Sequence, residues 1–263
     1  MKNLLPSENI IYEQPLNDAV RICLRLENLF EKIKRHRKTL TDSNSRMLIQ
    51  ILLDMLNVID RPDLKSKLTQ TLMQQATSLN LLKRSPHVDQ NELNHVLGQL
   101  NHYISAFHNL HTRMGDKLRN NEFLNMVRMQ MNNPGGIMDF NSPLFALWVR
   151  QSSQEHHLHF SEWLQEFDLL KEVSELLLRL IRDSVEAKSV TALEGFYQQS
   201  LNASVAYQLM RVSLPVDMNL YPEMSIGKHR MSIRFLMPDF SKGGGRPQQH
   251  RQTIKFDLYC CRI

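Results

Sequence analysis

Basic side chains on an alternating apolar segment could bind an anionic ligand. In the segment 230–237, apolar residues recur at period two on one side, and Arg230 and Arg234 lie on the other. This alternation is typical of a half-buried strand. Arginine presents a permanent charge and a planar fork of donors, which match a carboxylate or a phosphate. The pattern therefore predicts a small sheet with a positive face and an anionic partner.

A second basic stripe lies along one face of the first helix that the sequence predicts. Apolar residues recur every three or four positions from Leu16 onward, and a separate face at the same period contains Arg21 and Arg25. A charged helix face can also simply be exposed to water, and Glu27 and Glu31 would partly neutralise it. The stripe alone leaves both interpretations open.

Histidines and glycines form no pattern that predicts catalysis, a cofactor or a metal. His108 and His111 have a helical ligand spacing without the further ligands that a zinc site requires, and residues 156–159 are expected to be a polar, solvated loop. The double glycine at 135–136 follows a helix and is expected to end it. The triple glycine at 243–245 lacks the Lys-Ser/Thr pair and the following helix of a phosphate loop. We therefore expect a binding protein, not an enzyme, with no cofactor and no metal.

Length and composition are those of an ordinary globular protein with one large domain or two small ones. The chain has 263 residues, of which 42% are hydrophobic and 22% charged. It contains neither an apolar run long enough for a membrane span nor a signal-peptide pattern, so we expect a cytoplasmic protein that does not enter a membrane. Residues 1–194 hold 23 basic and 23 acidic side chains, and residues 195–263 hold 9 and 4. The net charge of +5 is therefore concentrated near the C-terminus.

The periodicities predict an α+β fold with a mostly helical N-terminal body and a small, largely antiparallel C-terminal β-domain. Helical patterns occupy residues 16–190 and strand patterns residues 191–263, and a β-prone run at 9–14 is expected to join the C-terminal sheet. The leucine-rich helix near residues 169–181 is either core or a dimer seam. The open faces of the strands are expected to collect four basic residues, namely Arg211, Arg230, Arg234 and Lys255.

Five segments in the chain together carry a family resemblance. They are YEQPLN with RICLRLENLF (12–30), NPGGIMDFNSPLFALW (133–148), LEGFYQQ (193–199), LYPEMSIGKHRMSIRF (220–235) and FDLYCC (256–261). In this order they resemble the ZapD family of cell-division proteins over nearly the whole chain, whereas the helices between residues 39 and 115 match mainly in pattern. The resemblance implies a homodimer without enzymatic activity. It also implies binding to the C-terminal tail of the tubulin-like division GTPase FtsZ, and bundling of FtsZ filaments at midcell.

The basic residues suggest how a partly acidic tail would bind. Arginines can hold its carboxylates beside apolar pockets, and two grooves in one dimer would join two filaments. Arg25 is the strongest candidate because it lies in the matched segment RICLRLE. The family pattern has basic or histidine side chains near the positions of Glu122 and Ala146, so this chain departs from it there. We hypothesise that one groove is lined by Arg25, Arg21, Arg128, Arg119, Arg230 and Arg234.

The alternative is a nucleic-acid-binding protein that uses the same basic sheet. Single-stranded RNA is usually recognised by exposed aromatic side chains that stack on its bases. The alternation instead places Phe235 and Phe256 on the inward side and leaves only Tyr259 pointing outward. Nucleic acid is therefore the less favoured partner. Competition between a tail peptide and DNA would separate the two hypotheses.

Overall fold

The computed structural model describes residues 9–38, 41–131, 133, 137–138, 140–240, 245 and 247–263. It divides into two compact units. We call residues Ile22–Leu178 the helical unit. The β-unit combines the N-terminal residues up to Arg21 with the segment Arg179–Ile263. The predicted fold class is confirmed, because a helical N-terminal body is followed by antiparallel sheets that an N-terminal strand joins.

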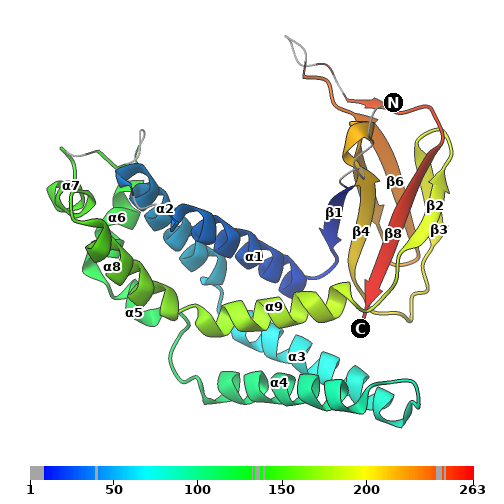
Figure 1. Cartoon of the computed structure of the whole chain (residues 1–263), viewed down its shortest axis with the longest axis horizontal. Helices are drawn as coiled ribbons and strands as arrows, with labels where there is room; N and C mark the ends of the chain where they lie inside the picture. The colour runs from blue at the N-terminus through cyan, green and yellow to red at the C-terminus, as the bar shows by residue number, and fades with distance from the viewer. Residues whose placement is uncertain are drawn as a thin grey trace, which may run out of the picture. The chain divides into compact units, whose positions relative to one another are not determined.

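Polar side chains cap the N-termini of several helices. Thr41 caps the second helix by accepting a hydrogen bond from the backbone N–H of Asn44, and Asp89 accepts from the first turn of the fourth. The helices are α1 (Asp18–His36), α2 (Asp42–Ile59), α3 (Leu64–Leu81), α4 (Gln90–Asn109), α5 (Asp116–Arg119), α6 (Glu122–Met131), α7 (Pro143–Val149), α8 (Ser153–Gln165) and α9 (Asp168–Arg182), with short 3-10 turns at Leu82–Arg84 and Val216–Met218 (Figure 1).

An aromatic cluster anchors α6, α7 and α8 in the core of the helical unit. Trp148 lies at its centre, with ring centroids 5.4 Å from Phe123 and 6.2 Å from Phe145. Phe160 and Trp163 of α8 complete the cluster. The leucine stripe of α9 is also core, because Val173, Leu177 and the other inward positions are buried within the chain. The structure thus supports the core interpretation of that stripe.

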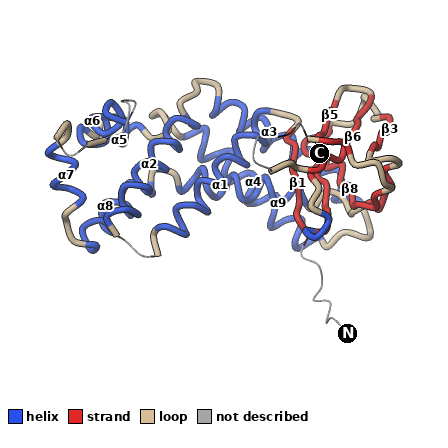
Figure 2. The backbone as a smooth tube through the Cα atoms, turned by 90° about the horizontal axis from the view of Figure 1, so that it is seen from above, coloured by secondary structure: helices blue, strands red, loops and turns tan. Residues whose placement is uncertain are grey.

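The β-unit contains every strand of the described residues (Figure 2). One sheet has the order β1-β4-β8-β2 and the other the order β3-β6-β5, with β7 beside β6, and all pairs are antiparallel. The N-terminal strand pairs with β4 from Asn9 opposite Pro215 to Pro15 opposite Leu209. The strands are β1 (Asn9–Pro15), β2 (Lys188–Ala192), β3 (Phe196–Ser200), β4 (Tyr207–Pro215), β5 (Tyr221–Ile226), β6 (Arg230–Met237), β7 (Gln248–Gln249) and β8 (Ile254–Arg262).

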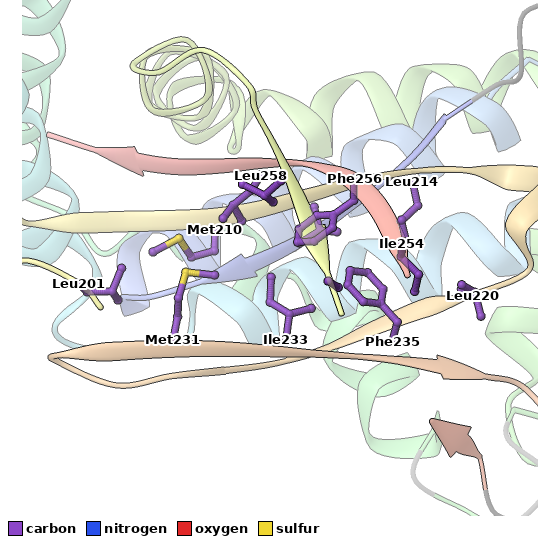
Figure 3. Packing of buried hydrophobic residues seen from close by; sticks show 13 residues of the cluster. Leu201, Met210, Leu214, Leu220, Met231, Ile233, Phe235, Ile254, Phe256 and Leu258 are labelled. Carbon is purple, nitrogen blue, oxygen red and sulfur yellow. The ribbon is translucent and has the colours of Figure 1, made fainter. Parts of the chain in front are cut away.

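The apolar alternation of β6 supplies one half of the β-unit core. Figure 3 shows Met231, Ile233 and Phe235 pointing toward side chains of the opposite sheet, among them Phe256 and Leu258 of β8. The rings of Phe235 and Phe256 meet edge to face with centroids 4.8 Å apart. The predicted inward side of these two strands is therefore confirmed, except that Met237 is exposed at the strand end.

Several sequence predictions about local structure are wrong. Residues 220–237 form a hairpin of β5 and β6, of which the alternation indicated only the strand at 230–237, and β2, β3 and β7 were not predicted. The cluster 156–159, expected to be a loop, lies in α8, which a reciprocal capping box between Ser152 and Glu155 begins. His156 is buried there. The predictions for the double and triple glycines fall mostly outside the described residues.

Candidate functional site

Asp60, directly after α2, is the centre of a group of charged residues that we call the Asp60 cluster: Asp60, Arg113, Arg119 and Arg128. Arg113 forms an ion pair with Asp60 Oδ1, and Arg119 Nη1 lies 3.1 Å from the same oxygen. Arg128 Nη2 lies 3.5 Å from Asp60 Oδ2 and donates a hydrogen bond to Asn57 Oδ1 at 3.0 Å. Three guanidinium groups, from α5, α6 and the segment before α5, therefore converge on one carboxylate.

The dipole of α2 explains why this carboxylate attracts cations from other elements. The C-terminus of a helix carries partial negative charge, so an acidic residue at that end is unfavourable unless a cation lies nearby. The last turn of α2 contains no basic residue. The cations must therefore come from elsewhere, and the arginines at 113, 119 and 128 supply them.

Burial separates the three arginines into one internal and two accessible groups. The side chain of Arg119 is only 12% exposed, against 53% for Arg113 and 37% for Arg128. Burial lowers the pKa of the Arg119 guanidinium below its ordinary value; Asp60 opposes this shift, and the positive charges of Arg113 and Arg128 add to it. Its Nε is buried without a hydrogen-bond partner among the described residues. The negative charges of Asp60 and Asp116 favour the charged form of Arg119, whereas its burial and the charges of Arg113 and Arg128 oppose it.

Two of the six predicted arginines contact the same carboxylate in the helical unit. Arg119 and Arg128 meet in the Asp60 cluster, and Arg25 is exposed on α1 in the same unit. Within the part of the chain that the structure describes, Arg25 forms no ion pair. Glu122 is exposed at the start of α6, and Ala146 is buried in α7.

The other three predicted arginines belong to the β-unit. Arg230 and Arg234 are exposed on the outer side of β6, and Arg234 pairs with Glu223 at 2.6 Å. Arg21 pairs with Asp18 at 2.7 Å. That all six arginines line one groove stays a prediction.

Arg211 does not belong to the open basic face on which the sequence placed it. Its Nε lies 3.0 Å from Glu13 Oε1, and Arg182 binds the same carboxylate with two hydrogen bonds of 2.9 and 2.7 Å. Its guanidinium also lies over the ring of Tyr259, 5.0 Å from the centroid. Glu13 on β1 thus neutralises Arg211 inside the β-unit. Lys255 on β8 is exposed, as predicted.

A cavity of about 620 Å³ lies between α1, α8 and α9 in the helical unit. Its apolar lining comes from Phe30, Ile33 and Leu164, and its charged rim mixes both signs. The cations are Lys34, Arg37, Lys38 and Lys171, and the carboxylates are Glu31, Asp168 and Glu175. Because these charges nearly balance, the cavity shows no preference for an anion.

His156 has a structural role in the helical unit. His156 Nε2 is 2.8 Å from the carbonyl oxygen of Trp148, and its Nδ1 is 2.8 Å from Ser45 Oγ. Among the described residues, no group of three or more histidines, cysteines and carboxylates could hold a metal ion. Phe235 and Phe256 are buried, so they are unavailable for stacking on bases. No helix of the described chain is both long and apolar enough to cross a membrane.

Sequence reasoning missed Asp60 and Arg113 as site residues. The two are 53 positions apart, and neither belongs to a periodic stripe. One signal was available, namely an acidic residue directly after a helix without basic residues in its last turn. It predicts that cations surround Asp60, although it does not identify them.

The Asp60 cluster gives the helical unit two exposed cationic groups, which suit an anionic partner. The family model described as ZapD, cell division protein, matches residues 24–234. A cell division protein ZapD of Coxiella burnetii is 43% identical over 254 residues, covering 97% of this chain and 98% of the relative. One of Methylococcus capsulatus is 31% identical over the same shares. The chain belongs to the ZapD family of cell division proteins.

Proposed function

We propose that this chain is a division factor without enzymatic activity, which acts in the cytoplasm at midcell by binding the C-terminal tail of FtsZ. A homodimer would carry two tail sites and crosslink FtsZ filaments into bundles that stabilise the Z-ring. Family membership supports the role in division. Many weak links between filaments would act together and yet remain reversible.

The exposed guanidinium of Arg25 is the observation that carries the tail-binding proposal. It lies on α1 without an ion-pair partner among the described residues. An exposed arginine of this kind keeps its donors for an external carboxylate. Arg21, Arg119, Arg128, Arg230 and Arg234 are proposed to complete the basic lining, either in one groove or as separate contacts along the tail.

Exposed apolar residues on α7 support self-association through the helical unit. Leu144 and Leu147 are 52% and 63% exposed, and their spacing of three places them on one face of the helix. Phe140, just before α7, is 78% exposed. Large exposed apolar side chains in one segment are typical of an interface. We propose a second copy of the chain as the partner that covers this face.

Arg25→Glu tests the tail site. A fluorescent peptide with the sequence of the FtsZ tail should bind the unchanged protein and lose most of its affinity for the variant, because the substitution replaces attraction with repulsion. Sedimentation velocity should show the same dimer for both proteins. Arg84→Glu, an exposed site on the 3-10 turn after α3, controls for the change in net charge. Equal peptide binding to both variants would remove Arg25 from the site.

A further inference from the structure

The Asp60 cluster has more donors than its own acidic groups use. Arg113 and Arg119 share one oxygen of Asp60, and Arg128 divides its Nη2 between the other oxygen and Asn57. Each guanidinium has five N–H donors, and those of Arg113 and Arg128 are substantially exposed. The cluster therefore holds Asp60 and still presents two cationic groups to solvent.

We propose that Arg113 and Arg128 bind two carboxylates of one acidic peptide segment, one on each guanidinium, with Asp60 between them. This inference rests on the proposed function, because it assigns the acidic part of the tail to this place. The charge of Arg119, which is mostly buried, adds to the positive potential at this place. Arg113, which no sequence pattern selected, becomes a binding residue.

The negative charge of Asp60 determines which anion suits the cluster. A compact dianion such as phosphate would have to lie close to Asp60 in order to reach both Arg113 and Arg128, and the two negative charges would repel each other. Two side chains of a flexible peptide can each approach one arginine from the solvent side. The cluster therefore favours two separate carboxylates over one phosphate and over a single carboxylate.

Binding of an acidic peptide to the Asp60 cluster can be tested with synthetic peptides whose sequences are not taken from FtsZ. The probes are a fluorescent peptide with two aspartates separated by one glycine, and a matched peptide in which one aspartate is replaced by asparagine. Inorganic phosphate serves as competitor. Binding is measured at low ionic strength by fluorescence anisotropy, because salt screens exposed charges.

The variant pair is one protein with both Arg113→Gln and Arg128→Gln. Its matched control is one protein with both Lys83→Gln and Arg84→Gln. Both pairs remove two positive charges from the helical unit, and the control residues are exposed on one 3-10 turn. We expect the two-aspartate peptide to bind the first pair at least about tenfold more weakly than the unchanged protein. The control should change affinity by less than about twofold. Equal losses in both pairs, or competition by phosphate at the concentrations at which the peptide binds, would overturn the inference.

Two further readouts keep the result decisive. If the variant pair does not fold, the Nε–Hε resonances of Arg113 and Arg128 in the unchanged protein decide: they should shift on addition of the two-aspartate peptide, and unmoved resonances would refute the assignment. The FtsZ tail peptide separates this inference from the proposed function. If the tail peptide binds the variant pair as tightly as the unchanged protein, the assignment of the tail to Arg113 and Arg128 is contradicted, whereas the proposed function is not. Failure of the tail to bind a protein that still holds the two-aspartate peptide contradicts the proposed function alone.

Discussion

Replacement of Glu13 by glutamine should destabilise the β-unit, because two arginines depend on this one carboxylate. Arg182 binds Glu13 through both of its oxygens, and Arg211 approaches one of them at 3.0 Å. Glutamine keeps the size of the side chain but loses the charge. Its NH₂ group would also face a guanidinium donor in place of an accepting oxygen. The substitution therefore removes a carboxylate that both cations contact.

The magnitude follows from distance and burial. One such contact near 3 Å has a Coulomb energy of about 5 kcal/mol at an effective dielectric constant of about 20, and the desolvation of both groups offsets most of it. Removal of one partner from a fully buried pair costs about 3–5 kcal/mol. The three side chains here are 14% to 23% exposed, so water can partly replace the lost contact. We expect Glu13→Gln to lower the free energy of unfolding by about 2–3 kcal/mol.

Hydrogen exchange in urea, followed by mass spectrometry, measures this loss in β1, β4 and β8 separately from the helices. Both tryptophans, Trp148 and Trp163, lie in the helical unit, so their fluorescence should change little. Glu223→Gln is the matched control because Glu223 forms an exposed pair with Arg234 in the same unit, and its loss should cost less than about 1 kcal/mol. Equal effects of the two substitutions would refute the reasoning.

Three other substitutions test the packing and the ionisation of the core. Gly195→Ala should destabilise the β-unit by at least about 2 kcal/mol, because φ is +70° and the new Cβ would lie 1.9 Å from the carbonyl oxygen of His250; an unchanged urea midpoint would contradict this. Phe145→Ala should cost about 3–5 kcal/mol in unfolding followed by tryptophan fluorescence, because the ring is buried against Trp148, and a loss below about 1 kcal/mol would be inconsistent with that packing. Burial raises the pKa of the Cys23 thiol from 9.0 to about 12, so the folded state keeps it neutral. Its contribution to stability is therefore complete below pH 9.0 and is lost as pH rises toward 12, by up to about 1.4 kcal/mol per pH unit. Cys23→Ala should flatten that decline in urea unfolding between these pH values, and an unchanged slope would exclude Cys23 as a cause.

The sequence predicted those parts of the fold that local periodicity determines. The alternation from Met231 to Phe235 identified an inward strand face, and the stripe of α9 identified a helix without deciding between core and dimer seam. The hairpin of β5 and β6 was missed because both strands carry mixed apolar and polar residues around the short turn at 227–229. The first part of α8 was expected to be a loop because its residues are polar, and its buried histidine, His156, is held in part by Ser45, which is 111 positions away.

The candidate site was less predictable than the fold, because contacts between residues far apart in the sequence determine which of its charged groups are paired. Arg119 and Arg128 were selected as basic, but the sequence gives no indication that both approach Asp60. Arg211 was placed on an open face because alternation cannot reveal that Glu13, almost two hundred positions away, neutralises it. Net charge indicates that a surface is basic. Only the arrangement in space indicates which arginines are already paired.

Co-sedimentation with polymerised FtsZ tests the proposed function most directly. Filaments of full-length FtsZ are compared with filaments that lack the C-terminal tail, at the same protein concentrations. If this protein crosslinks filaments through their tails, it should pellet with the first and form bundles visible by electron microscopy, and remain in the supernatant with the second. Equal pelleting with both kinds of filament would contradict tail capture, and no pelleting with either would contradict the proposed partner.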